Sequence, residues 1–259
     1  MRLRKRPPLL NHAKKLATRP ARSSLCAVAR RAACFDAPPR LQYAALRPLI
    51  ACKHVTANDD ELPDPLVVMA LELESGGLFG PASIPVLYTG VGKINAAHHL
   101  TLALARYARA KRALPLVINF GTAGSPSFPI GALVACNAFV QRDMDATALG
   151  VEAGETPFDA SPQRLEFPPV VTDLPQGVCG TGDSFSTAHT ALHFNVVDME
   201  AYALAKVCWL MGTTFVSVKY ITDGADSSAA TSWQDNLARA AEGFLAVYAA
   251  LDSRREPRK

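Results

Sequence analysis

The sequence predicts an α/β fold of three layers, in which helices cover both faces of a sheet. Two observations support this prediction. Short apolar runs alternate with helical patterns from residue 63 onward, as in folds whose strands are joined by helices. Several runs are apolar at nearly every position, which is typical of strands covered on both faces. The predicted strands are Leu66–Leu71, Pro85–Tyr88, Leu116–Phe120, Ala132–Cys136, Gly177–Cys179, Val196–Met199 and Thr214–Ile221.

Three segments carry apolar side chains at the spacing of an amphipathic helix: Lys93–Arg109, Glu200–Met211 and Ser232–Leu251. Ser232 and Asp235 have the spacing of a capping box, so we expect the last helix to begin at Ser232. Strands and helices alternate without an internal repeat. Residues 61–259 are therefore predicted to form one domain of about 200 residues.

Charge divides the chain into two parts. Residues 1–58 contain 13 Lys and Arg and one acid, and the rest contains 14 bases and 22 acids, so the net charges are +12 and −8. Because prolines recur in the first part, residues 1–60 are predicted to be a basic, disordered extension. This arm has three interpretations: an organellar transit peptide, a tail for nucleic acid or anionic lipid, or an upstream stretch without a folded role.

Composition and motifs exclude several classes of function for the body that follows the arm. No apolar run reaches the ~20 residues of a membrane helix, and no secretory signal is recognisable. We therefore expect a cytoplasmic protein, unless the arm targets it to an organelle, and no binding of the body to a membrane or to nucleic acid. The cysteines lack the spacing of a zinc site, and neither a P-loop nor a nucleophile elbow is found. The sequence thus predicts no metal and no cofactor.

Acidic and polar residues follow directly after the predicted strands. Ligands of α/β sheets bind at the carboxyl ends of strands, so we expect these side chains to line one acidic crevice. Such a crevice suits sugar hydroxyls and developing positive charge better than phosphate. The glycines of Gly90–Lys93 and Gly121–Gly124 are expected in tight turns that bring backbone close to a ligand or a strand. The strand-end residues are Glu72, Glu74, Thr122, Asp183, Asp198, Glu200, Thr222, Asp223 and Asp226.

Six segments, in order along the chain, carry a more specific signal. They are Ala70–Glu74 (ALELE), Thr89–Ala97 (TGVGKINAA), Val117–Gly124 (VINFGTAG), Gly182–Phe185 (GDSF), Val197–Ala205 (VDMEAYALA) and Tyr220–Asp226 (YITDGAD). The ordered set resembles the purine nucleoside phosphorylase/nucleosidase superfamily, and specifically its hydrolytic methylthioadenosine/S-adenosylhomocysteine nucleosidase branch, over residues 65–252. The resemblance implies a nucleoside phosphorylase-like α/β/α fold with a central mixed, twisted sheet, and cleavage of the N-glycosidic bond between a purine and ribose.

The resemblance also implies a role for individual residues. Asp223 would protonate N7 of the leaving purine, Glu74 would deprotonate the attacking water, and Glu200 would bind the ribose 2′- and 3′-hydroxyls. Further residues are implied to bind the substrate: Met199 beneath the sugar, Phe185 and Ser186 at the base, Thr222 beside Asp223 or the base, Trp233 near the 5′ substituent, and Thr122.

Hydrolysis is favoured over phosphorolysis because phosphorylases of this superfamily hold phosphate with arginines beside the glycine turns. No arginine lies in Met69–Ser75 or directly before Gly121. A phosphate dianion beside Glu74 and Glu200 without a cation is disfavoured by charge. The resemblance thus implies release of free adenine from a methylthioadenosine-type or S-adenosylhomocysteine-type nucleoside, within methionine salvage. The alternatives are hydrolysis or phosphorolysis of adenosine, inosine or a futalosine-like compound, and a non-catalytic nucleoside-binding protein.

The sequence departs from the family pattern at Ser186 and Gly224, which differ from the commonest residues of the nucleosidase branch, and in the length of one connection. Only 15 residues separate Glu74 from Gly90, where the family has a longer pair of strands, so one hairpin is expected to be shortened or lost. The resemblance further implies a homodimer, in which a loop of one subunit closes the 5′ pocket of its neighbour. By position, this loop is Arg142–Leu149 together with Pro157.

Overall fold

The computed structural model describes residues 64–184, 192–225 and 229–254, and gives the backbone alone for 229–236 and 238. The described residues all lie in one compact unit of the chain. Its elements are β1 (Pro65–Met69), η2 (Glu72–Ser75), β2 (Val86–Tyr88), α1 (Lys93–Arg109), β3 (Leu116–Gly124), β4 (Leu133–Gln141), η3 (Thr147–Leu149), β5 (Arg164–Glu166), β6 (Gln176–Thr181), β7 (Val196–Asp198), α2 (Ala201–Met211), β8 (Phe215–Asp223) and α3 (Ala229–Asp252).

The described strands form one mixed sheet. β2, β1, β3 and β8 run parallel to one another, and β4, β6 and β7 run together in the opposite direction. β5 pairs antiparallel with β4 at the edge. β8 pairs with both β3 and β4, and the end of β3 pairs with β7. The strands β3, β8, β4, β6 and β7 therefore close into a ring.

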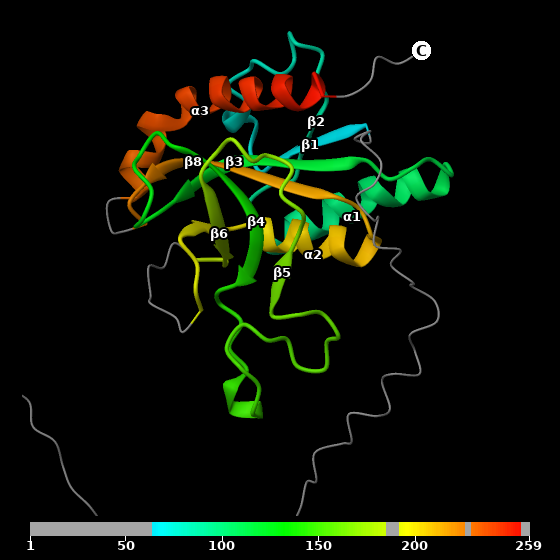
Figure 1. The fold of residues 1–259 in the computed structure, drawn as a ribbon, viewed down its shortest axis with the longest axis vertical. Helices are drawn as coiled ribbons and strands as arrows, with labels where there is room; N and C mark the ends of the chain where they lie inside the picture. Colours follow the sequence, from blue (N-terminus) through cyan, green and yellow to red (C-terminus); the bar gives the residue numbers. More distant parts are fainter. Residues whose placement is uncertain (1–63, 185–191, 226–228, 255–259) are drawn as a thin grey trace, which may run out of the picture. The chain divides into compact units, whose positions relative to one another are not determined.

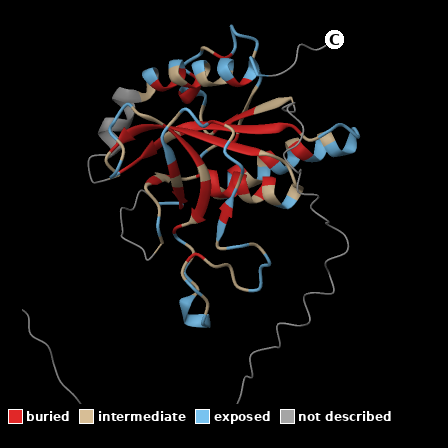
Figure 2. Cartoon of the chain, viewed as in Figure 1, coloured by how far each residue is buried: buried red, intermediate tan, exposed pale blue. Residues whose placement is uncertain are grey.

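Helices cover both faces of this sheet, as Figure 1 shows. On one face, Phe244 of α3 stacks on Phe120 of β3 with ring centroids 5.1 Å apart. On the other face, α1 and α2 pack together, and Leu100, Leu104 and Leu204 belong to a second apolar core. Figure 2 shows the buried strands between α3 and α1, which are exposed on their outer sides, whereas α2 is buried over most of its length. These observations confirm the predicted three-layer α/β/α fold with a central mixed sheet.

Four strands, β3, β4, β6 and β8, extend further than their apolar runs predict. β3 continues through Gly121–Gly124, and β8 continues to Asp223, because the strands keep pairing in parallel as far as Gly124 and Asp223. The expected tight turn at Gly121–Gly124 is therefore wrong, whereas Gly90 and Gly92 do lie in a turn, with positive φ, before α1. The sequence missed β5, since a three-residue edge strand with one buried side chain, Leu165, shows almost no periodicity.

The start of the last helix also differs from the prediction. α3 begins at Ala229, so the capping box expected at Ser232 is wrong and this residue lies inside the helix. Ala229 and Ala230 are strong helix formers, which explains why the helix extends ahead of the predicted cap.

The shortened segment between Glu74 and Gly90 contains a single strand. β2 pairs in parallel with β1, and residues 76–85 pass between η2 and β2 without a strand of their own. Phe79 anchors this connection, because its side chain is 1% exposed and its ring lies 6.1 Å from that of Phe120. Among the residues that the structure describes, no helix has both the length and the apolar character needed to cross a membrane.

Candidate active site

Glu74 lies in η2, directly after β1, and is buried. Its Oε1 accepts hydrogen bonds from the backbone N–H of Thr122 at 2.9 Å and from the Thr122 hydroxyl at 3.1 Å. Its Oε2 accepts from the N–H groups of Ala70 and Leu71, both at 3.1 Å. These donors hold the carboxylate against the end of β3. Thr122, predicted to bind substrate, contacts the candidate base in this structure.

Asp223 is the last residue of β8 and is also buried. Its Oδ2 accepts a hydrogen bond from the Thr222 hydroxyl at 2.9 Å, which is one of the two contacts implied for Thr222. Its Oδ1 accepts from the N–H of Ala225 at 2.9 Å. A Cβ on Gly124 would lie 2.4 Å from this Oδ1, so the carboxylate approaches β3 this closely only because residue 124 is glycine.

The end of β3 brings these segments together. Gly124 pairs with β8 at Asp223 on one side and with β7 on the other, and β7 leads directly into Glu200. Glu74 is bound to Thr122, two residues before Gly124. The candidate acid, base and ribose-binding carboxyl therefore gather around the last residues of one strand, as their positions at strand ends predicted.

Glu200 directly precedes α2, and its Oε1 accepts a hydrogen bond of 2.8 Å from the N–H of Gly92. Burial raises the pKa of Glu200 to about 8, and the negative charges of Asp198 and Glu74 work in the same direction, against Lys219 and Gly92. The surroundings of this carboxyl thus favour its protonated form. The two oxygens of a carboxyl group can accept hydrogen bonds from two neighbouring hydroxyls.

A buried ion pair between Lys219 and Asp198 lies close to Glu200. Nζ of Lys219 is 2.8 Å from Oδ2 of Asp198, and both side chains are 1% exposed. Asp198 also accepts hydrogen bonds from the Thr181 hydroxyl at 2.5 Å and from the N–H of Ala201 at 2.8 Å. Burial alone would lower the pKa of Lys219, but Asp198 outweighs it and raises that pKa above its usual value. Conversely, burial would raise the pKa of Asp198, but Lys219 holds it below its usual value.

Lys219 also corrects the sequence analysis, which placed no cation beside Glu74 and Glu200. A Cβ on Gly121 would lie 3.1 Å from Nζ of Lys219 and 3.4 Å from Oε1 of Glu74, so both groups flank the same point of β3. The signal that could have identified this residue is a lysine inside an apolar run predicted to be covered on both faces. Arg142, directly after β4, is a second buried cation; the sequence placed it at the start of the loop expected to close a neighbour's pocket, whereas its guanidinium binds Gly182 and Ser184 of its own chain.

Of the remaining predicted site residues, the structure describes some and not others. Met199 is half-buried between β7 and α2, and Glu72 is exposed. Trp233 belongs to α3, but its side chain is outside the described part of the chain. The structure likewise does not describe Phe185, Ser186 and Asp226.

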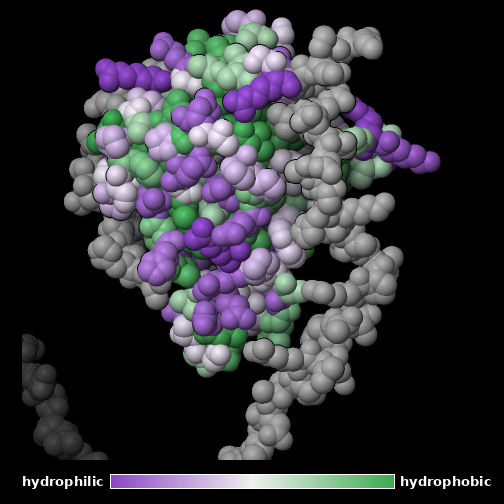
Figure 3. Space-filling view, viewed as in Figure 1, coloured by the Kyte–Doolittle hydropathy of each residue, from purple (hydrophilic) through white to green (hydrophobic). Residues whose placement is uncertain are grey.

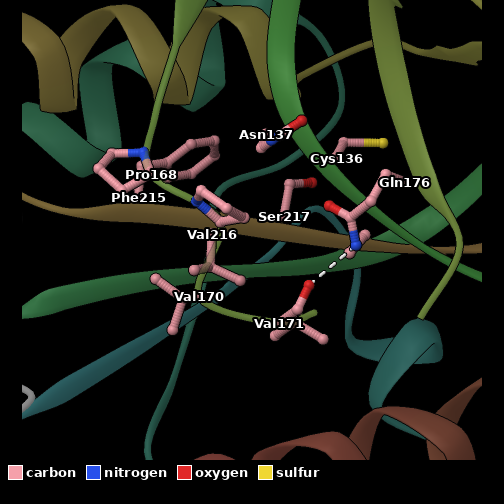
Figure 4. Close-up of a pocket in the computed structure, with 11 residues that line it drawn as sticks. Cys136, Asn137, Pro168, Val170, Val171, Gln176, Phe215, Val216 and Ser217 are labelled. Carbon is pink, nitrogen blue, oxygen red and sulfur yellow. Dashed lines mark hydrogen bonds between the residues drawn. The ribbon is translucent and has the colours of Figure 1, made fainter. Parts of the chain in front are cut away.

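One pocket of the structure lies apart from these carboxyl groups. The pocket in Figure 4 is lined at the start of β8 by Phe215, Val216 and Ser217, and its wall contains no Asp, Glu, His, Lys or Arg. Ser217 is six residues before Asp223, roughly 20 Å along an extended strand. Within the described residues, no group of three His, Cys, Asp or Glu side chains could hold a metal ion.

Comparisons with known proteins agree with the geometry. Residues 74–251 match the phosphorylase superfamily. The 5′-methylthioadenosine/S-adenosylhomocysteine nucleosidase of Baumannia cicadellinicola is 32% identical over 183 residues, which cover 63% of this chain and 77% of that relative. The solved structure of a nucleosidase of this kind from Colwellia psychrerythraea 34H, in complex with adenine, has a TM-score of 0.64 and 20% identity, covering 75% of this chain and 96% of its own. A futalosine hydrolase mutant from Helicobacter pylori has a TM-score of 0.63 and 19% identity, covering 73% and 100%. At these identities, the two structures show a shared fold.

The raised pKa of Glu200 predicts a pH dependence of stability. Its carboxyl has a pKa of about 8 in the folded chain and 4.5 as an ordinary glutamate. It therefore contributes stability that is fully present below pH 4.5 and is lost as the pH rises through about 8. We expect Glu200→Gln to flatten the decline in the free energy of unfolding between pH 5 and pH 8. Urea unfolding of both chains across this range measures the two slopes, and equal slopes would contradict the assignment.

Proposed function

Because the chain belongs to the phosphorylase superfamily, and within it to the 5′-methylthioadenosine/S-adenosylhomocysteine nucleosidases, we propose that it hydrolyses the N-glycosidic bond of these two nucleosides. The products are free adenine and the corresponding 5-thioribose derivative, which places the enzyme in methionine salvage. The observation that carries the proposal is the gathering of Glu74, Glu200 and Asp223 at the end of β3. We assign catalysis to residues 61–259, which contain every described element and the matched family region.

In the proposed reaction, the bond between C1′ of the ribose and N9 of the purine breaks and its electron pair leaves with the base. Asp223 gives a proton to N7, which neutralises the departing purine. The ribose develops oxocarbenium character, which nearby carboxylates stabilise. Water adds to C1′ and gives its proton to Glu74, whose position four hydrogen bonds fix. Glu200 binds the ribose hydroxyls, with Met199 beneath the sugar.

The charges around the site support water rather than phosphate as the nucleophile. Lys219 lies near Glu74, but its charge is paired with Asp198 at 2.8 Å. Lys93, next to the glycine that binds Glu200, is paired with Asp143 at 2.5 Å. Neither cation is left to balance a phosphate dianion among carboxylates, so phosphate binding here costs more than water binding.

We also propose that the protein is a homodimer. The support is a set of large apolar side chains exposed to solvent, which association with a second subunit would cover. Ile94 on α1 is 81% exposed, and the preceding Val91 is 43% exposed. Leu149 and Phe158, at the end of the molecule that carries η3, are 69% and 77% exposed. Figure 3 shows hydrophobic residues among hydrophilic ones at the surface of this end.

Base release from the full chain tests the proposed reaction. Methylthioadenosine, S-adenosylhomocysteine, adenosine and inosine are supplied separately, with and without phosphate, and the free base is measured. We expect adenine from the first two nucleosides at a rate that phosphate does not change. Release that requires phosphate would overturn hydrolysis, and release from inosine alone would overturn the substrate assignment.

The acid and base roles are tested by Asp223→Asn and Glu74→Gln. Each change removes a proton donor or acceptor from the transition state, so we expect kcat/KM to fall by about 10²–10⁴-fold. Glu72→Gln is the matched control, because Glu72 is an exposed glutamate in the same short helix as Glu74. A variant whose kcat/KM at its optimal pH stays within a few-fold of that of the unchanged protein would contradict the role assigned to that residue.

The dimer is tested by Ile94→Glu, which places a charge at the exposed apolar surface of α1. Light scattering after gel filtration should give twice the chain mass of 27.7 kDa for the unchanged protein and the single-chain mass for the variant. Ala249→Glu, at an exposed position of α3, serves as the control and should remain dimeric. A single-chain mass for the unchanged protein would contradict the proposal.

A further inference from the structure

The turn that binds Glu200 is held by a second carboxylate. Gly92 donates its backbone N–H to Oε1 of Glu200 at 2.8 Å, and the next residue, Lys93, donates its N–H to Oδ1 of Asp183 at 2.9 Å. Consecutive N–H groups at the start of α1 are thus bound by carboxylates from two different segments. A Cβ on Gly92, whose φ is 95°, would lie 3.3 Å from this Asp183 oxygen. The Asp183 carboxylate therefore fits closely against the turn.

Asp183 is in turn fixed by the loop after β4. Its backbone N–H donates to Oδ2 of Asp143 at 2.9 Å. The ammonium of Lys93 lies 2.5 Å from Oδ1 of Asp143 and 3.6 Å from Oδ2 of Asp183, so it bridges the two carboxylates. Burial works to raise the pKa of Asp143, but the Lys93 ammonium and the Asp183 N–H outweigh it and lower that pKa. Both carboxylates thus converge on a single lysine of the turn.

Arg142 holds the backbone on both sides of Asp183. Its guanidinium donates to the carbonyl of Gly182 at 3.3 Å, to the hydroxyl of Ser184 at 3.3 Å and to the carbonyl of Ser184. The approach is close, since a Cβ on Gly182 would lie 2.8 Å from Cζ of Arg142. Arg142 is 8% exposed, and a buried guanidinium bound to carbonyls on either side of one residue restricts that residue's backbone.

We infer that Asp183, held by Asp143 and Arg142, is a positioning residue for ribose recognition. It acts on the nucleoside through the Gly92–Lys93 turn, which fixes the orientation of the Glu200 carboxyl. The inference rests on the proposed function, in which Glu200 binds the ribose hydroxyls. A carboxyl displaced by about 1 Å loses most of the advantage of a preset geometry. Loss of Asp183 should therefore weaken the preference for a nucleoside that has the ribose hydroxyl over one that lacks it. It should not only lower kcat/KM for both.

The test compares two substrates in several variants of the full chain. The substrates are methylthioadenosine and its 3′-deoxy analogue, and the measured quantity is the ratio of their kcat/KM values. Any difference in the intrinsic reactivity of the two nucleosides cancels when this ratio is compared between variants. In the unchanged protein, the 3′-hydroxyl should raise kcat/KM by about 10- to 100-fold, as expected for a hydrogen bond to a charged or strongly polar group. Asp183→Asn should reduce the ratio about tenfold, and Asp143→Asn should reduce it by a smaller factor.

Asp159→Asn is the matched control. Asp159 pairs with Lys206 of α2 at 2.6 Å, and the two side chains are 30% and 18% exposed, close to the 29% and 15% of Asp143 and Lys93. Removing this pair should leave the substrate ratio unchanged, because a merely structural loss lowers kcat/KM for both substrates by the same factor.

The outcomes separate the two proposals. An active Asp183→Asn variant with the ratio of the unchanged protein would overturn the positioning role alone. If Asp183→Asn does not fold, an unchanged ratio in Asp143→Asn would overturn it equally. Absence of base release by the unchanged protein from methylthioadenosine would overturn the proposed function, and this inference with it.

Discussion

The buried ion pair between Asp198 and Lys219 is the contact on which the rest of the site depends. It joins β7 to β8 past β3, where Gly121 leaves room for the lysine side chain. Asp198 also binds Thr181 of β6 and the first N–H of α2 at Ala201. Two charges removed from water each carry a penalty of several kcal/mol, about offset by their attraction and by these added hydrogen bonds. The pair therefore contributes little net stability, but it fixes how these elements meet.

This arrangement also sets the charge that the substrate meets. Glu200 follows Asp198 by two residues, so Asp198 contributes to its raised pKa, and Lys219 partly offsets this effect. Glu74 is held by donors from two backbone segments at β1 and β3. These residues thus combine a carboxylate fixed by hydrogen bonds, a carboxyl with a raised pKa, and a lysine paired with Asp198. Such an environment favours a cationic ribose over a bound anion.

The sequence predicted that the three candidate carboxyl residues lie together, but it did not predict the contacts that hold them. Glu74, Glu200 and Asp223 could be located because each follows an apolar run, and the carboxyl ends of strands meet at one edge. Lys219 escaped notice because an apolar run does not reveal which neighbour will neutralise a lysine within it. The contacts of Arg142 were not predicted, because its partners are backbone carbonyls about 40 residues away and such pairings leave no local pattern in a sequence.

The same ion pair links the choice of nucleophile to the stability of the fold. A phosphate ion would need a free cation near Glu74, and Lys219 is positioned for this only if Asp198 no longer binds it. Removing Asp198 would leave a lysine with 1% exposure unpaired, and breaking a buried pair in this way costs about 3–5 kcal/mol. That cost is a large fraction of the stability of an ordinary domain. A change from hydrolysis to phosphorolysis on this fold would therefore have to bring its cation from another segment, while Asp198 and Lys219 stay paired.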